Sequence, residues 1–213
     1  MNWIGLWTLT SREVGRFFKV YRQTVIPGLI SSVLYILIFG FTLEQRISSI
    51  EGISYTIFII PGLIMMNTLT NASSNPSSSL LQMKLTGQVP DLMQAPLSSL
   101  EISLAFIVGG VVRGVVNGIL ILLIGMWIGG MEVLYPVATI GFIFVVSIAF
   151  SSMGLLLGQL ADTWDQLATM QNFFLTPLSF LGGIFYSVNM LPDWARTISA
   201  FNPIYYMLNG LRY

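Results

Sequence analysis

The sequence predicts an all-α integral membrane protein, a polytopic bundle of hydrophobic helices that crosses a bilayer several times. Charged residues make up 8% of the 213 positions and hydrophobic residues 54%, whereas about a quarter of an ordinary soluble domain is charged. So few charges cannot build a soluble surface. The sequence also contains five largely charge-free stretches, each able to supply the about 20 apolar residues with which a helix spans a bilayer.

Cysteine and histidine are both absent, which narrows the possible chemistry. Without them the chain has no disulfide, no thiolate nucleophile, no zinc site of the usual ligand types and no Ser-His-Asp triad. Its two lysines, Lys19 and Lys84, lie in no glycine-rich phosphate-binding loop. We therefore expect no enzyme activity and no cofactor, and any ATP-driven work has to come from another subunit. Nine basic against nine acidic residues give no bias toward nucleic acid.

Residues 1–22 are predicted to form an amphipathic helix that lies on the membrane surface. Arg12, Arg16 and Lys19 follow one another at i, i+4 and i+7, while aromatic residues lie on other faces. A secretory signal is the alternative, but its short basic region would not extend over an aromatic-rich segment of this length. Four of the nine basic residues lie in this segment, and the positive-inside rule therefore predicts a cytoplasmic N-terminus.

Five membrane spans are predicted within a single transmembrane domain that covers the whole chain. They are 25–43, 55–70, 102–130, 134–160 and 167–188. The uncharged tail after residue 197 is broken at Asn202-Pro203 and stops at Tyr213 without a polar end. We therefore expect a sixth span beyond the end of the chain.

Alternation of the spans from a cytoplasmic N-terminus fixes the predicted sides of the loops. The segment 73–100 and the loop with Asp162 and Asp165 become cytoplasmic. Residues 44–51, Glu132 and 191–196 then face outward.

Arg113 is the one charge inside a predicted span. Such a charge normally faces the protein interior or water. The alternative is that the third helix begins deep in the cytoplasm and that Arg113 reaches back to the lipid headgroups. Asp162 or Asp165, at the cytoplasmic end of the next span, is its expected ionic partner.

Glycines recur four residues apart in the third and fourth spans, at Gly110, Gly114 and Gly118 and again at Gly154 and Gly158. Small residues at this spacing let helix backbones approach closely where lipid offers no hydrophobic drive. The pattern is typical of static helix packing, and a moving helix interface is the alternative.

Three segments resemble the permeases of ABC-2 type transporters. Residues 80–113, LLQMKLTGQVPDLMQAPLSSLEISLAFIVGGVVR, are similar to the loop and third helix of that family. Residues 173–213, FFLTPLSFLGGIFYSVNMLPDWARTISAFNPIYYMLNGLRY, are similar to its fifth helix, outer re-entrant segment and entry to a sixth helix. Residues 58–63, FIIPGL, are similar to its second-helix motif. The resemblance implies an outer segment at 189–203.

The resemblance also implies a function and partners. The chain would be the permease of an exporter in a plasma membrane, such as a bacterial inner membrane, with a second permease copy and a separate ATP-binding cassette subunit. It would move a small molecule, lipid or polysaccharide. A passive channel or membrane scaffold without ATPase coupling is the alternative.

Two sets of residues are expected to serve this transport. Carried over from the family, the ATPase-coupling segment falls on 89–96, with the coupling residues Asp91, Leu92, Met93, Gln94 and Pro96. Four aromatic residues near the fifth span could line the translocation path, although packing and lipid contact are the alternatives: Phe173, Phe174, Phe185 and Tyr186.

Overall fold

The computed structural model of the chain describes residues 2–42, 49–50 and 52–212. In chain order its elements are α1 (Trp3–Lys19), α2 (Tyr21–Thr24), α3 (Ile26–Tyr35), the π-helix η1 (Ile36–Phe41), β1 (Ser49–Ile50), β2 (Ile53–Ser54), α5 (Tyr55–Leu85), α6 (Val89–Gln94), α7 (Ser99–Gly129), α8 (Pro136–Leu160), α9 (Trp164–Leu181), the 3-10 helix η2 (Val188–Met190), α10 (Asp193–Ala200) and α11 (Pro203–Arg212).

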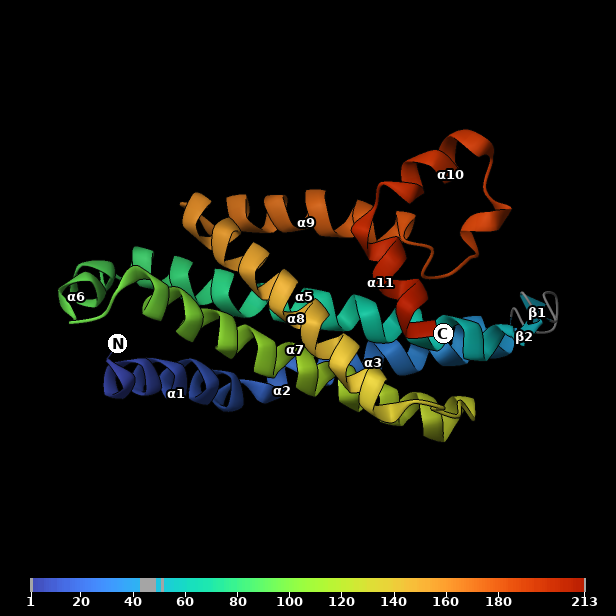
Figure 1. Cartoon of the computed structure of the whole chain (residues 1–213), viewed down its shortest axis with the longest axis horizontal. Coiled ribbons are helices and arrows are strands. Elements are labelled where there is room, and N and C mark those ends of the chain that lie inside the picture. The colour runs from blue at the N-terminus through green and yellow to red at the C-terminus, as the bar shows by residue number, and fades with distance from the viewer. Residues whose placement is uncertain (1, 43–48, 51, 213) are drawn as a thin grey trace.

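These elements form an elongated helical bundle (Figure 1). The N-terminus and α6 lie at one end of its long axis, and the strands β1 and β2 lie at the other. We call these the α6 end and the strand end. The two short strands pair antiparallel, and they are the one sheet among the described residues. The predicted helical bundle is thus present, with a small hairpin added.

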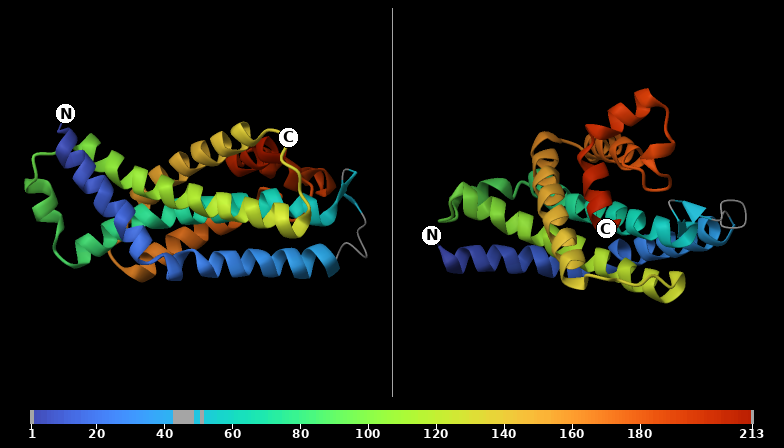
Figure 2. Two further views of the ribbon diagram at one scale, coloured as in Figure 1. Left: turned by 90° about the horizontal axis from the view of Figure 1, so that it is seen from below. Right: turned by 45° about the vertical axis from the view of Figure 1, so that its right-hand side comes forward.

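The predicted interfacial segment is made of α1 and α2. Figure 2 shows that α1 leaves the line of α3 at a bend, so the two do not form one straight helix. Leu9, Glu13 and Phe17 of α1 are buried, whereas Trp3 and Trp7 are 68% and 73% exposed. The helix therefore packs on the bundle, mainly on α7, with one face and presents its tryptophans outward.

α5 is the central helix, and its length differs from the prediction. The span expected at 55–70 continues to Leu85 as one helix of 31 residues, so that the beginning of the predicted loop 73–100 is helical. The run of asparagine and serine in this region is typical of a solvated connection. In the structure most of these polar side chains are buried, which a helix tolerates when its neighbours supply hydrogen bonds.

Glycines of α7 and α8 let both helices lie directly against α5. A Cβ at Gly114 would come within 2.8 Å of Ala72 Cβ, and a Cβ at Gly158 within 2.8 Å of Ser77 Cα. A Cβ at Gly154 would overlap the backbone of Ser73. The close helix approach predicted from the glycine spacing is therefore confirmed. Both helices approach α5, and Gly110, Gly114 and Gly118 of α7 also lie against α8.

Four helical segments of the described residues are long and apolar enough to cross a membrane: Tyr21–Gly40, Tyr55–Leu85, Ser99–Gly129 and Pro136–Leu160. They match four of the predicted spans. The fifth prediction, 167–188, falls on α9, which begins earlier, ends at Leu181 and has polar residues in its first turns. α9 is not among the four segments, because its composition is more polar, and its crossing stays a prediction.

The predicted outer segment 189–203 contains part of η2 and the whole of α10. From there α11 leads back toward α5 and α8. Of the predicted outer loop 44–51, positions 44–48 and 51 lie outside the described residues, as does position 43 at the end of the first predicted span.

Candidate functional site

The predicted coupling segment forms a short helix, α6, at one end of the bundle (Figure 1). Pro90 lies in its first turn, and Pro96 follows its last residue closely. Proline suits a first helical turn and disfavours helix in the residue before it, so the two prolines bound the helix. A turn at Gly87, with φ of 71°, joins α6 to the end of α5, since glycine adopts positive φ without strain.

One face of α6 anchors it to the bundle. Leu92 is half-buried and packs against a cluster of buried side chains formed by Met83, Phe106 and Leu155. These three residues belong to α5, α7 and α8. Of the five residues predicted to couple, Leu92 is thus the one that packs inward, and it holds α6 in place.

The other face of α6 is open. Asp91, Met93, Gln94 and Pro96 are exposed, and the Met93 side chain is 77% exposed. Asp91 makes no hydrogen bond or ion pair with any described residue. A flexible, polarizable methionine beside a carboxylate and an amide is a surface suited to contact with another protein.

The beginning of the chain is tied to the same region. The Asn2 side-chain amide donates to the Pro96 carbonyl oxygen at 3.2 Å, and the Asn2 backbone N–H donates to Glu101. Glu101 in turn forms a capping box with Ser98 at the start of α7, which satisfies two backbone donors of the helix end. The starts of α1 and α7 therefore frame α6.

A ladder of asparagines runs along the half of α5 that leads to α6. Asn67, Asn71 and Asn75 stand four residues apart, on one face of the helix. We call them the asparagine ladder, and each side chain bonds a different helix. Asn67 Nδ2 donates to Ser32 Oγ of α3 at 2.9 Å, and Asn71 Oδ1 accepts from Arg113 Nε of α7 at 3.0 Å.

The third rung connects α5 to α1. Arg16 Nη2 donates to the backbone oxygen of Asn75 at 2.7 Å and to its Oδ1 at 3.2 Å. Sequence reasoning missed the ladder because it assigned these asparagines to a span end and a loop. Their i, i+4, i+8 spacing is the signal that could have found it.

Two further side chains, Gln171 and Lys84, extend this network to α9 and to the end of α8. Gln171 Nε2 of α9 donates to Ser77 Oγ at 2.8 Å. Lys84 Nζ donates to the carbonyl oxygens of Gln159 and Ala161, both at 2.7 Å, where α8 ends. A cation at a helix C-terminus satisfies free carbonyl groups and interacts favourably with the helix dipole. The half of α5 that leads to α6 is therefore hydrogen-bonded to α1, α3, α7, α8 and α9.

The partner predicted for Arg113 is wrong. Its hydrogen bond among the described residues goes to the amide of Asn71. Asp162 instead lies 3.3 Å from Lys84 Nζ. The Arg113 side chain is half-buried between α7 and α5, where a neutral amide oxygen accepts from the guanidinium without bringing in a second charge.

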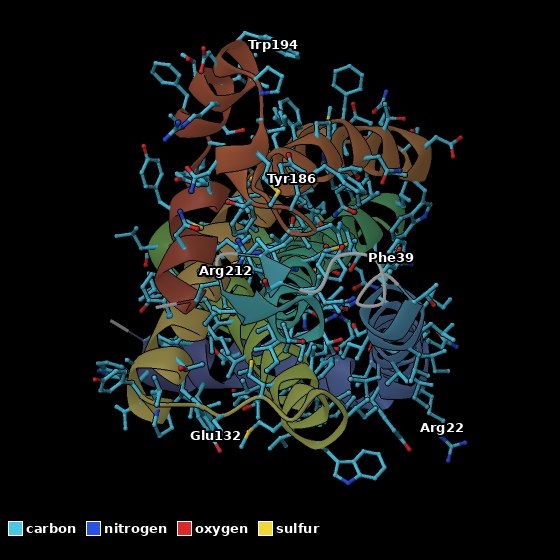
Figure 3. The ribbon with its side chains drawn as sticks, turned by 90° about the vertical axis from the view of Figure 1, so that its right-hand side faces the viewer. Arg22, Phe39, Glu132, Tyr186, Trp194 and Arg212 are labelled. Carbon is cyan, nitrogen blue, oxygen red and sulfur yellow. The ribbon has the colours of Figure 1, made fainter. Side chains whose placement is uncertain are left out.

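The four aromatic residues proposed for the translocation path do not come together. Phe173 and Phe174, in the middle of α9, are 77% and 50% exposed. Phe185 packs with Tyr35 of α3, with ring centroids 5.7 Å apart. The Tyr186 hydroxyl donates to the Phe180 carbonyl oxygen at 2.8 Å. Phe173 and Phe174 thus point away from the bundle, whereas Phe185 and Tyr186 pack at the strand end, where Figure 3 shows Tyr186.

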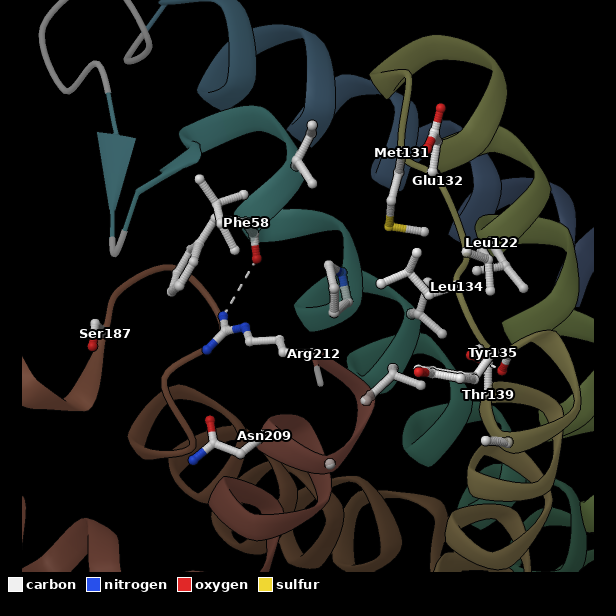
Figure 4. Close-up of a pocket in the computed structure, with 18 of the residues that line it drawn as sticks. Phe58, Leu122, Met131, Glu132, Leu134, Tyr135, Thr139, Ser187, Asn209 and Arg212 are labelled. Carbon is white, nitrogen blue, oxygen red and sulfur yellow. Dashed lines mark hydrogen bonds between the residues drawn. The ribbon is translucent and has the colours of Figure 1, made fainter.

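A cavity of about 540 Å³ opens at the strand end, between α5, α11 and the connection from α7 to α8. Arg212 lies over the Phe58 ring, 3.8 Å from its centroid, and donates to the Gly183 carbonyl oxygen at 2.9 Å. Figure 4 shows its guanidinium pointing toward the Phe58 carbonyl. Arg212 therefore joins α11 to α5 and to the chain after α9.

The described residues offer connection and contact surfaces rather than reacting groups. No three Asp, Glu, His or Cys side chains in the described part of the chain come close enough to hold a metal ion. The asparagine ladder joins helices, and α6 presents a surface at the end of the central one. This arrangement can transmit a movement along α5.

Comparison with known proteins identifies the family. Residues 5–213 match the family described as ABC-2 type transporter. The chain is 38% identical over 213 residues to the inner membrane transport permease YadH of Escherichia coli strain K12, an alignment that covers 100% of this chain and 83% of the relative. It is 23% identical over 215 residues to nodulation protein J of Rhizobium leguminosarum bv. viciae, with 100% and 81% covered. The chain therefore belongs to the ABC-2 type transporter family, as a multi-pass membrane permease that works with a separate ATP-binding subunit and is not itself an enzyme.

Proposed function

We propose that this chain is one membrane half of an exporter for a small molecule, lipid or polysaccharide. A second copy of the chain forms the other half. An ATP-binding subunit docks on the exposed face of α6 from the cytoplasm. Its ATP-driven movement is carried along α5 to the strand end, and the substrate passes between the two copies.

The observation that carries this proposal is the position of α6. It is anchored through Leu92 on the buried cluster of Met83, Phe106 and Leu155 and leaves Asp91 and Met93 free for a partner. A docked subunit that pushes α6 also pushes α5, because only the short turn at Gly87 separates them. The asparagine ladder then distributes the push to α1, α3 and α7.

The distribution of basic residues supports a cytoplasmic α6 end. Arg12, Arg16 and Lys19 of α1 and Lys84 of α5 lie on the elements nearest this end. Basic residues are enriched on the cytoplasmic side of membrane proteins. The strand end, with α10 and the cavity at Arg212, then faces outward.

Exposed apolar side chains of α9 support a second copy in the bilayer. Phe173 and Phe174 are 77% and 50% exposed in a single chain. We assign them to the surface that meets the second copy or the substrate path, whereas Phe185 and Tyr186 shape the outer end of that path.

The sidedness is tested by cysteine labelling, since the chain has no cysteine of its own. Met93 of α6 and Met190 of η2 are 77% and 63% exposed and lie on opposite sides in the proposed topology. In intact cells, a membrane-impermeant maleimide should label Met190→Cys but not Met93→Cys. After permeabilisation it should label both. Labelling of Met93→Cys from outside would overturn the orientation.

The coupling is tested with an affinity-tagged chain purified from membranes of its source cells. An ATP-binding subunit should co-purify with the wild-type protein. Met93→Asp should reduce this recovery about tenfold or more, because it places a charge in a contact region. Met190→Asp is the matched control and should leave recovery unchanged. Recovery with Met93→Asp equal to that with the wild-type protein would mean that the exposed face of α6 does not carry the contact with the ATP-binding subunit.

A further inference from the structure

A second, smaller cavity of about 360 Å³ lies between α1 and the end of α5 and reaches Gln88 at the start of α6. We call it the α1–α5 groove. Arg12, Arg16 and Lys19 line it from α1, and Ser79 and Gln82 line it from α5. Arg16 also bonds the asparagine ladder, whereas Arg12 and Lys19 belong neither to the ladder nor to the exposed face of α6.

The groove carries an excess of positive charge. Three cations line it against one carboxylate, that of Glu13, for a net charge of +2. Glu13 is 1% exposed and already lies 3.1 Å from Arg12 Nη2 and 3.6 Å from Arg16 Nε. Lys19 forms no hydrogen bond or ion pair with any described residue. One buried carboxylate cannot neutralise three cations.

Arg16 shows that the donors in the groove are not all satisfied. Its Nη2 group bonds Asn75, but its buried Nε has no hydrogen-bond partner among the described residues. Burial lowers the pKa of Arg16, against the opposing effect of Glu13. Glu13 Oε2, 3.6 Å from this Nε, also lacks a hydrogen-bond partner among the described residues, so the two atoms face each other as an ion pair without a close hydrogen bond. An anion in the groove would add negative charge beside Arg16 and offset the cost of burying its guanidinium.

The faces of α1 place the groove at the depth of lipid headgroups. At 3.6 residues per turn, Trp3, Trp7 and Phe18 fall on one stripe of the helix, and Arg12 and Lys19 fall on another, about 130° away around the helix axis. The buried face with Leu9, Glu13 and Phe17 separates the two stripes. The three aromatic side chains are 68%, 73% and 54% exposed. Exposed aromatic residues prefer the interface between acyl chains and water. When the aromatic side of α1 is turned to the acyl chains, Arg12 and Lys19, on the other flank of its buried face, are turned toward the lipid phosphates.

We propose that the α1–α5 groove binds the phosphate group of an anionic glycerophospholipid. Arg12, Arg16 and Lys19 hold the phosphate, and Ser79 and Gln82 supply neutral hydrogen bonds. The acyl chains extend from the groove into the bilayer beside α1. A bound lipid would fix α1 against the helix that leads to α6.

Native mass spectrometry of the purified chain in detergent tests this proposal. Titration with phosphatidylglycerol should give a dissociation constant at least about fivefold lower than titration with phosphatidylcholine, because each surface cation adds about this much to the affinity for an anionic lipid. Lys19→Gln should weaken phosphatidylglycerol binding about fivefold. Lys19 makes no contact whose loss would unfold the protein, and Lys19→Arg should restore binding.

Arg22→Gln is the matched control, since it removes one positive charge from the same part of the chain. Arg22 does not line the groove, and Figure 3 shows its side chain projecting away from the bundle. It should change the dissociation constant by less than about twofold. Equal losses of affinity for phosphatidylglycerol in Lys19→Gln and Arg22→Gln would mean that negative lipid is attracted diffusely. That result would overturn the proposal of a lipid site in the groove.

Two further results would also overturn the proposal. If soluble glycerol phosphate, at the same concentration as the lipid, competes with phosphatidylglycerol for the groove, the ligand is a free anion rather than a lipid. Lower recovery of the ATP-binding subunit with Lys19→Gln, at unchanged lipid binding, would assign the groove to the protein partner. The second result leaves the proposed function of the chain intact and so separates the two proposals.

Discussion

From residue 55 to 66 the buried residues of α5 are apolar apart from Thr56, whereas from 67 to 85 six of its eleven buried residues are threonine, asparagine or serine. The contacts of the first half are apolar and have no preferred direction. For example, Ile60 lies in the space left by Gly125 and Gly129. The second half is held by bonds with defined partners. Hydrogen bonds fix the register of helices more sharply than apolar contacts do. We infer that the polar half moves as a unit with its partners and that the apolar half can slide and repack.

The largest loss of stability is expected from a substitution whose new side chain meets the backbone of the polar half of α5. In Gly154→Ala the new Cβ overlaps the Ser73 backbone, which cannot rotate away as a side chain can. We expect a loss of about 3 kcal/mol, at the upper end of overpacking costs, measured as thermal stability and folded yield in detergent. Gly141→Ala is the control on the same helix, because its Cβ meets nothing within 4 Å. Similar behaviour of the two variants would contradict the direct contact of α8 with α5.

The next largest loss of stability is expected when the second rung of the asparagine ladder, the bond between Asn71 and Arg113, is removed. Asn71→Leu leaves the half-buried guanidinium of Arg113 without its acceptor, and we expect about 2 kcal/mol of destabilisation. Thr70→Leu, at the exposed neighbouring position, should be nearly neutral. Adding Arg113→Leu to Asn71→Leu should recover part of the loss, because an apolar pair replaces an uncompensated charge. Additive losses in this double-mutant cycle would show that the two residues are not coupled.

These contrasts also explain how far the sequence predicts the structure. Four spans, the limits that Pro90 and Pro96 set to α6 and the close approach of the glycines depend on local signals. These signals are apolar length, proline position and residue size. The continuation of α5 to Leu85 depends on partners from five other helices. A polar run such as Asn75-Pro76-Ser77 has the same composition whether water or protein surrounds it, so composition alone ends the span too early.

The candidate site follows the same division. Asp91, Met93, Gln94 and Pro96 are exposed on α6, as a surface segment between spans predicts. The inward position of Leu92 could not be predicted, because it depends on Phe106 and Leu155 from other helices. Charge alone likewise predicted an aspartate as the partner of Arg113, whereas the structure places the Asn71 side chain of α5 within hydrogen-bond distance of it. Pairing between helices is the information that a single sequence lacks.

The apolar half of α5 should tolerate an added methyl group better than the polar half. In Gly125→Ala the Cβ meets the side chain of Ile60, which can change its rotamer. We expect a loss of about 1 kcal/mol, at the lower end of overpacking costs, in the thermal melt used for Gly154→Ala. A loss as large as that of Gly154→Ala would mean that both halves of α5 are equally rigid, and the comparison would fail.

The smallest effect is expected at the first rung of the ladder, where the polar half of α5 begins. Ser32 is fully buried, accepts from Asn67 Nδ2 and donates to the Gly28 carbonyl oxygen at 2.9 Å. Asn67 Nδ2 also donates to the Leu63 carbonyl oxygen at 3.2 Å. Ser32→Ala therefore removes one of two acceptors, and hydrogen bonds between membrane helices average about 0.6 kcal/mol. We expect that loss in the thermal melt, with the exposed neighbour Ser31→Ala as a neutral control. A loss above about 2 kcal/mol would exceed the range of such bonds and would mean that α3 depends on the ladder as strongly as α7 does.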